Sequence, residues 1–201
     1  MALKNILLIN GHQPFPSSPG RLNASFSERG RQILETAGRN VRTVSTAQDW
    51  NIEHEVKNQL WADILLIQFP LNSMSVPWPL KRYLDEVYTA GMDGRLARGD
   101  GRTRSDLSKQ YGSGGRMQGQ HYMLSVTLNA PREAFDNPAQ ELFDGKSLDD
   151  LLAPVHINFA FFGLSALPTF AAHDVAKQPT IEDDFNRFEK HLQTHLLKDA
   201  A

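Results

Sequence analysis

Short apolar runs alternate along this chain with segments whose apolar residues recur every three or four positions. The runs predict strands, because a strand covered on both faces of a sheet is almost continuously hydrophobic. The expected strands are residues 5–10, 41–45, 64–69, 122–127 and 164–171. The second of them alternates apolar and polar residues, and Pro168 interrupts the last, so both suit the edge of a sheet.

Amphipathic stripes predict helices between these strands. The first helix begins near Leu22 and ends before Gly38, a favoured residue type just after a helix. The other expected helices are residues 53–62, 77–89, 147–162 and 181–197. Strands that alternate with helices predict one α/β domain over residues 1–201, with a mainly parallel sheet in the order 2-1-3-4-5.

Residues 91–119 break this pattern. They contain eight glycines and many charged residues, with almost no apolar periodicity. Connections of this length are uncommon, so we expect the segment to be functional or to be ordered by a partner.

Composition excludes several classes of function. The net charge of −2 gives no electrostatic reason to expect binding to nucleic acid or to an anionic membrane. The absence of cysteine excludes disulfides, thiolate chemistry and iron–sulfur clusters, and it suits a reducing compartment. The first residues do not read as a signal peptide, and no apolar run approaches the ~18 residues of a membrane helix. We therefore expect a cytoplasmic protein without a transmembrane segment.

The loop after the first strand offers groups that suit a phosphate. It lacks Gly-x-Gly-x-x-Gly, and the chain contains no Gly-x-x-x-x-Gly-Lys-Ser/Thr, which weakens a Rossmann enzyme and a P-loop NTPase. The loop instead supplies His12, Ser17, Ser18, Gly20 and Asn23 at the start of a helix, where hydroxyls and free N–H groups suit a phosphate or pyrophosphate. Helix capping by Ser and Asn is an equal alternative.

Two more loops follow buried strands at the carboxyl edge of the predicted sheet, where open α/β folds bind ligands. The loop after residue 69 is stiffened by Pro70, Pro77 and Pro79, so its backbone groups are already arranged for a flat polar ligand. Residues 128–135 would lie beside it, and the two loops together could clasp a planar ring. Ordinary strand-to-helix connections and an Asn-Pro turn are equal alternatives.

The seven histidines show no metal-ligand spacing. His191 and His195 are four residues apart on the last helix, but no acidic residue is placed to complete a site. We expect both at the surface and no metal. The chain also has no Gly-x-Ser-x-Gly elbow, which argues against an α/β-hydrolase.

Several ordered motifs carry a resemblance to a known family. They are Leu-Trp-Ala-Asp at 60–63, Gln-Phe-Pro-Leu at 68–71, Pro-Trp-Pro-Leu-Lys at 77–81, Asp-Gly-Arg-Thr-Arg at 100–104, Tyr-Gly-Ser-Gly-Gly at 111–115, Asn-Ala-Pro-Arg-Glu-Ala-Phe at 129–135 and Leu-Pro-Thr-Phe at 167–170. Over residues 6–191 the chain resembles the flavin-dependent NAD(P)H:quinone reductases of the flavodoxin-like fold. The resemblance implies a flavodoxin-like three-layer α/β sandwich with a five-stranded parallel sheet and a long glycine-rich insertion.

The resemblance also implies a homodimer with one FAD in each active site, built at the subunit interface. It assigns the FAD pyrophosphate and ribityl chain to Ser18, Gly20, Leu22, Asn23, Ala24 and Ser25. It assigns the isoalloxazine ring to Pro70, Leu71, Asn72, Ser73 and Met74, whose backbone groups would bond its polar edge, and the far edge of the ring to Thr127, Leu128, Asn129 and Ala130. Tyr111, in the glycine-rich insertion, would reach the adenosine half.

The implied reaction is the two-electron reduction of quinones by NAD(P)H, in which a hydride passes through the flavin with ping-pong kinetics. Asn129 is the candidate catalytic residue, for polarising the ring or the substrate. The loop at 71–74 lacks the tryptophans that relatives often carry. Phe135 stands where they can carry a tyrosine, so a tyrosine relay is not expected. The alternatives are a flavin-binding regulatory subunit of a membrane transport system and a flavodoxin-like electron carrier.

Overall fold

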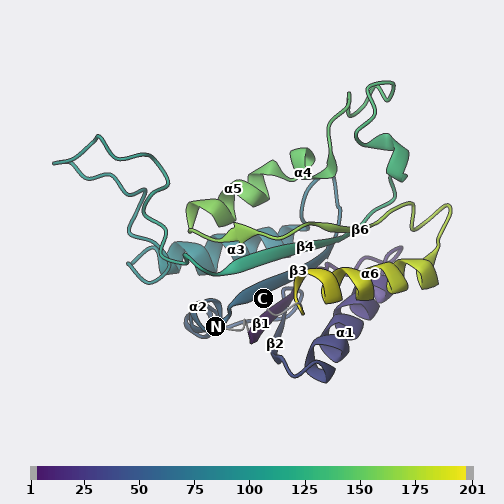
Figure 1. Cartoon of the computed structure of the whole chain (residues 1–201), viewed down its shortest axis with the longest axis horizontal. Coiled ribbons are helices and arrows are strands. Elements are labelled where there is room, and N and C mark those ends of the chain that lie inside the picture. The colour runs from purple at the N-terminus through teal and green to yellow at the C-terminus, as the bar shows by residue number, and fades with distance from the viewer. Residues whose placement is uncertain (1–3, 198–201) are drawn as a thin grey trace.

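Parallel strands run through the middle of the molecule, with helices on both faces (Figure 1). The computed structural model describes residues 4–197. Its elements, in chain order, are β1 (Asn5–Asn10), α1 (Arg21–Thr36), β2 (Asn40–Ser45), α2 (Ile52–Trp61), β3 (Ile64–Pro70), α3 (Trp78–Gly91), β4 (His121–Thr127), η1 (Arg132–Ala134), α4 (Leu148–Leu151), α5 (Ala153–Phe161), β5 (Ser165–Ala166), β6 (Phe170–Ala172) and α6 (Ile181–His195).

The strand order is β2-β1-β3-β4-β5, with β6 also paired to β4, and every pair is parallel. This confirms the predicted flavodoxin-like order and the two predicted edges. Successive strand residues point to opposite faces of the sheet. Leu7 and Ile9 therefore join a core under α2, α3 and α5, whereas Ile6 and Leu8 join a core under α1 and α6.

Two predicted elements are each split at a proline. The helix expected over 147–162 is two helices, α4 and α5, which meet at Leu152. Pro154 has no N–H for the helical bond across this junction. The strand expected over 164–171 is likewise two strands, β5 and β6, separated around Pro168, so the edge beside β4 is interrupted. The predictions of one helix and one strand were wrong, because a proline ends regular hydrogen bonding locally.

The glycine-rich segment forms an arm that projects from the body (Figure 1). Its base is held by a hydrogen bond from the N–H of Arg98 to the carbonyl of Gly114, 2.8 Å long. Gly115 approaches the backbone of Phe162 and Gly163 so closely that a Cβ atom would overlap it. Since the arm joins the end of α3 to the start of β4, it lies at the amino end of β4.

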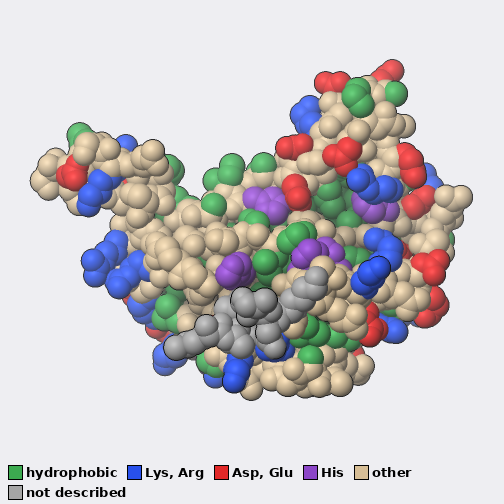
Figure 2. All heavy atoms as spheres, in the orientation of Figure 1, with side chains coloured by type: hydrophobic (Ala, Val, Ile, Leu, Met, Phe, Trp, Pro, Cys, Tyr) green, Lys and Arg blue, Asp and Glu red, His purple; other side chains and the backbone are tan. Residues whose placement is uncertain are grey.

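A second projection follows the opposite end of β4, and Figure 2 shows the two as separate lobes on either side of the body. This second lobe contains η1 and leads into α4. Within residues 4–197, no helix has the length and apolar character required to cross a bilayer.

Candidate functional site

A cavity of about 610 Å³ opens at the carboxyl edge of the sheet. Its walls come from the loop after β1 with the start of α1, the ends of β3 and β4, and the loop between β6 and α6. The sequence-predicted residues that line it are His12, Ser17, Ser18, Gly20, Leu22, Asn23, Ser25, Pro70, Leu71, Asn72, Thr127, Leu128 and Asn129. The structure therefore brings together the three loops that were expected to share one ligand.

Helix α1 begins at this cavity without a side-chain cap. Its N-cap is Gly20, in the left-handed conformation with φ of 82°, and the first turn contains no acidic residue. The first residue of the helix is instead Arg21, which also lines the cavity. The first N–H groups of a helix lack intrahelical partners and carry partial positive charge, so this end of α1 is electropositive.

Asn23 does not cap this helix, although capping was an equal alternative in the sequence. Its side chain turns into the protein, where Nδ2 donates to Oδ1 of Asn10 at 2.6 Å and Oδ1 accepts from Nε2 of Gln68 at 3.0 Å. The uncapped helix end therefore favours the other alternative, an anion-binding start of α1.

His12 lines the same cavity and is 7% exposed. Its Nε2 is buried and has no hydrogen-bond partner among the residues that the structure describes. Burial lowers the pKa of His12, and the backbone carbonyl of Ser18 partly opposes that shift. An unpartnered buried nitrogen is costly unless a ligand satisfies it, so His12 is suited to contact an anion.

Charge around the cavity is one-sided. Its titratable lining side chains are His12 and Arg21, and none of the lining residues is acidic. A negatively charged ligand would therefore meet no repulsion from the walls.

The end of β3 turns sharply beside the cavity. The backbone of Asn72 exchanges two hydrogen bonds of 2.9 Å with that of Ser75, which leaves Ser73 and Met74 at the tip. Both tip residues have positive φ, 47° and 61°, as a type I′ turn requires. Residues with side chains are strained in this conformation, and such strain clusters at ligand sites.

The ends of β3 and β4 are tied together, which limits the backbone donors that remain. The N–H of Leu71 donates to Thr127, that of Leu128 donates to Ala172, and that of Asn72 is used in the turn. At the turn tip and in the two residues after Leu128, the backbone N–H groups of Ser73, Met74, Asn129 and Ala130 have no partner among residues 4–197. Of these four residues only Asn129 lines the cavity, so a ring edge would meet the donors of the turn tip where it extends past the cavity wall.

The loop after β4 holds Asn129 in an exposed position, with no hydrogen bond from its side chain to another described residue. The carbonyl of Ala130 accepts from Nδ1 of His173 at 3.3 Å and from the N–H of Asp174 at 3.2 Å. Phe135 is buried and stacks on Phe143, with ring centroids 4.5 Å apart. The loop is thus anchored on both sides, and Asn129 is left exposed at the wall of the cavity.

Five predicted site residues do not line this cavity. Ser73, Met74 and Ala130 border it in sequence but lie outside its wall, and Ala24 faces the outer side of α1. Tyr111 lies in the arm, at the opposite end of β4, where it is 72% exposed and its ring is tilted against that of Phe161 of α5 with centroids 5.6 Å apart. A contact between Tyr111 and a ligand in this cavity is therefore not made within one chain.

The sequence reasoning missed one wall of the cavity. Val175, Ala176 and Pro179 line it from the loop between β6 and α6, together with Ile181, the first residue of α6. That loop follows the last parallel strand, so the carboxyl-edge argument used for the other loops would have found it. Arg21 was also missed, although a cation in the first turn of a helix is unfavourable for the helix itself and points to an anion.

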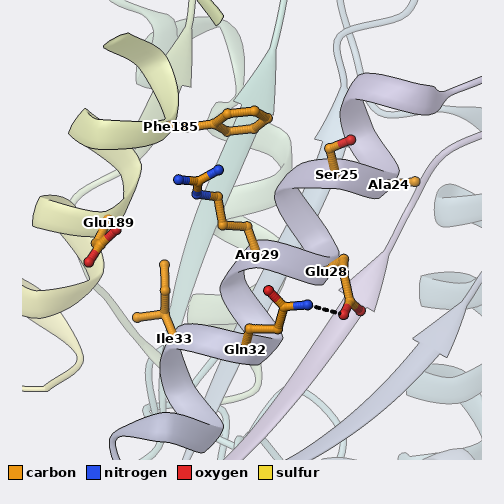
Figure 3. A pocket seen from close by; sticks show the side chains of 8 residues that line it. All are labelled: Ala24, Ser25, Glu28, Arg29, Gln32, Ile33, Phe185 and Glu189. Atoms are coloured by element: carbon orange, nitrogen blue, oxygen red, sulfur yellow. Dashed lines mark hydrogen bonds between the residues drawn. The ribbon is translucent and has the colours of Figure 1, made fainter. Parts of the chain in front are cut away.

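A larger hollow, of about 760 Å³, lies between α1 and α6 (Figure 3). Its charged groups are already engaged: Gln32 donates to Glu28 at 2.6 Å, and the guanidinium of Arg29 lies 4.7 Å from the ring centre of Phe185. It follows two helices rather than the ends of the strands, so the carboxyl-edge cavity is the better candidate site.

The remaining histidines form no metal site within the described part of the chain. His191 is half-buried, and its Nε2 bonds the carbonyl of Pro168 at 2.8 Å. Its ring lies 4.5 Å from that of His195.

Comparison with known proteins gives consistent matches over nearly the whole chain. A family model described as a flavodoxin-like fold matches residues 4–196. The NADPH:quinone oxidoreductase MdaB of Haemophilus influenzae is 38% identical over 189 residues, which cover 94% of this chain and 97% of that protein. The resemblance indicated by the sequence motifs is confirmed.

Solved structures agree on the fold. A Klebsiella pneumoniae protein assigned as a quinone reductase superposes with a TM-score of 0.77 at 22% identity, covering 98% of this chain and 86% of that one. The general stress protein 14 of Treponema denticola, solved with FMN, superposes with a TM-score of 0.61 at 16% identity, covering 95% and 97%.

Proposed function

Because the chain belongs to the flavodoxin-like family, we propose that it is a flavin-dependent NAD(P)H:quinone oxidoreductase whose cofactor binds in the carboxyl-edge cavity. The observation that carries the proposal is the meeting of an uncapped helix start, the unpartnered nitrogen of His12 and two strand-end loops around one cavity. The 38% identity to a named NADPH:quinone oxidoreductase supports the same activity, with NADPH as the reductant.

The donor set fits the two chemically different halves of a flavin nucleotide. The start of α1, with His12 and Arg21, would hold the phosphates, because all three offer positive charge or N–H donors. The tip of the β3 turn and the loop after β4 would meet the polar edges of the ring through their unpartnered N–H groups. Leu71 and Leu128 supply apolar wall between them.

When bound, the flavin supplies the capacity to accept a hydride from NAD(P)H and to deliver two electrons to a quinone. The chain's own residues would hold both substrates against the same exposed face in turn, which requires ping-pong kinetics. The amide of Asn129 would polarise the ring or the substrate. Phe135 offers no proton, because it has no hydroxyl and is buried.

FAD, rather than FMN, is the proposed cofactor, with Tyr111 at its adenosine half. Since Tyr111 lies at the far end of β4 from the cavity of its own chain, this contact requires the arm of a second copy. A homodimer with its active sites at the interface is therefore part of the proposal. The exposed Leu107 and Tyr111 on the arm, 73% and 72% accessible, support it as a surface that a partner would cover.

The test is to titrate the protein with FAD and then measure NADPH oxidation with menadione as acceptor. His12→Gln should weaken FAD binding about tenfold, since it removes one charge-assisted contact. His191→Gln is the matched control, because His191 is half-buried on α6 and does not line the cavity. Equal losses in the two variants would contradict the assignment of the site, and tight FAD binding without NADPH oxidation would contradict the activity.

A further inference from the structure

Three polar side chains form a row across the sheet just below the cavity. Asn10, Gln68 and Ser125 are register partners on β1, β3 and β4. They point to the face that α1 and α6 cover, since they follow Ile6 and Leu8, Ile64 and Leu66, and Met123 in the alternation of each strand. On β1 and β3 the residues of this face that precede the polar one are apolar.

The row is joined to α1 by an unbroken chain of hydrogen bonds. Oγ of Ser125 donates to Oε1 of Gln68 at 2.6 Å, and Nε2 of Gln68 donates to Oδ1 of Asn23 at 3.0 Å. Nδ2 of Asn23 donates to Oδ1 of Asn10 at 2.6 Å, which also accepts the backbone N–H of His12 at 3.2 Å. The amides of Gln68 and Asn23 each use both the oxygen and the nitrogen, so neither of these two can flip without breaking two bonds.

Filling a core with this chain of hydrogen-bonded side chains costs free energy that apolar side chains would not cost. Ser125, Gln68 and Asn23 are 0%, 1% and 2% exposed. Burying amides costs free energy unless every bond is made, and apolar side chains of similar size would pack there without that requirement. What the polar row adds is position, because it fixes where α1 begins relative to β1, β3 and β4.

We propose that Gln68 is a positioning residue for the phosphate end of the cofactor, acting through Asn23. Asn23 lies in the first turn of α1, and its inward-facing amide holds that turn against the strands. The backbone of His12 is held at the other end of the same hydrogen-bond chain. The inference rests on the proposed flavin site: it says that the anion-binding groups of α1 and His12 are set by a residue that touches no ligand.

The proposal predicts different effects on a flavin that carries phosphate and on one that does not. Gln68→Met keeps the size of the side chain but removes its bonds to both Ser125 and Asn23. The dissociation constant for FAD should rise by about tenfold or more, the loss expected for misplaced charge-assisted hydrogen bonds. The dissociation constant for riboflavin, which has the ring but no phosphate, should change by less than about threefold. Neither measurement requires turnover.

The matched control is Gln59→Met. Gln59 is also fully buried, and its side chain bonds Tyr83 at 3.1 Å and Tyr88 at 3.0 Å between α2 and α3, away from the cavity. Gln59→Met should lose about as much stability as Gln68→Met, but its ratio of FAD to riboflavin affinity should be unchanged. If Gln68→Met fails to fold, Ser125→Ala removes only the hydroxyl at the start of the hydrogen-bond chain and should change the ratio of FAD to riboflavin affinity. Ser125→Thr keeps a donor and should restore that ratio.

The outcomes distinguish this inference from the proposed function. If the unmodified protein binds neither FAD nor riboflavin, the flavin site itself is wrong. If it binds both, and neither Gln68→Met nor Ser125→Ala changes the ratio of the two affinities, the flavin site stands and the positioning role of Gln68 is overturned.

Discussion

The imidazole of His12 occupies the space that a Cβ atom on Gly20 would need. Gly20 also has a φ of 82°, so both its backbone conformation and its close neighbour require glycine. This packing puts an unpartnered histidine nitrogen beside the uncapped start of α1, which makes the pair the anion-binding end of the cavity.

Gly20→Ala should therefore disable the site as well as strain the backbone. The left-handed alanine costs ~1 kcal/mol of stability, and the new methyl group must displace the ring of His12. Gly38→Ala is the control, because Gly38 has a φ of 76° at the other end of α1 and nothing within 4 Å of a built Cβ. Thermal unfolding should show a loss of stability in both variants, and only Gly20→Ala should weaken FAD binding, by about tenfold or more. Equal FAD affinity in Gly20→Ala and Gly38→Ala would contradict the assignment of Gly20 and His12 to the anion-binding end of the cavity.

FAD affinity should depend on pH through His12. Burial lowers the pKa of His12 below its usual value near 6.5, so the ligand-free imidazole is neutral at pH 7. A bound anion favours the charged imidazole and raises that pKa, so binding takes up a proton and strengthens as the pH falls from about 8 to about 5.5. Titrations across this range should show the trend in the unmodified protein and lose it in His12→Gln. FAD is the ligand to use, because a phosphate monoester titrates itself near pH 6.

The sequence reasoning succeeded where local pattern decides the outcome. The strands β1, β3 and β4 are mostly apolar along their buried residues, and the carboxyl-edge rule then placed three of the four loops that form the cavity. The prediction of helices and strands failed at Pro154 and Pro168, where apolar periodicity continues through a residue that cannot donate a backbone hydrogen bond.

Other features depend on tertiary packing. No local signal distinguishes Asn23 as a cap from Asn23 as a buried partner of Gln68, because the choice depends on a strand 45 residues away. Tyr111 was assigned to the cofactor by resemblance, whereas the chain's connections place its arm at the far end of β4. The role of Tyr111 remains a prediction, and it requires a second copy.

The strained turn after β3 should be open to stabilisation. Replacing Ser73 and Met74 by Asn and Gly, the pair that type I′ turns favour, should raise the free energy of unfolding by ~1 kcal/mol. Riboflavin affinity should be retained, because the proposed contacts at the tip are made by backbone N–H groups. Chemical denaturation and a riboflavin titration check the two statements. Loss of riboflavin binding with a gain in stability would show that the side chains themselves make the contact.

Tyr111 should discriminate between FAD and FMN. Tyr111→Ala should weaken FAD binding several-fold, since one aromatic contact to the adenosine half is removed, and leave FMN binding unchanged. Leu107→Ala is the control in the same arm, at 73% exposure. Equal effects on FAD and FMN would place Tyr111 away from the adenosine. Sedimentation of the FAD-loaded protein should show a dimer, because the contact requires the arm of a second chain.

The most direct test of the central claim is an anaerobic titration followed by visible absorbance. FAD-loaded protein should bleach on one equivalent of NADPH and recover its yellow colour when menadione is added without further NADPH. That result would establish flavin binding and both half-reactions in one experiment. A protein that takes up FAD but is not bleached by NADPH would contradict the oxidoreductase, and one that takes up no flavin would contradict the site itself.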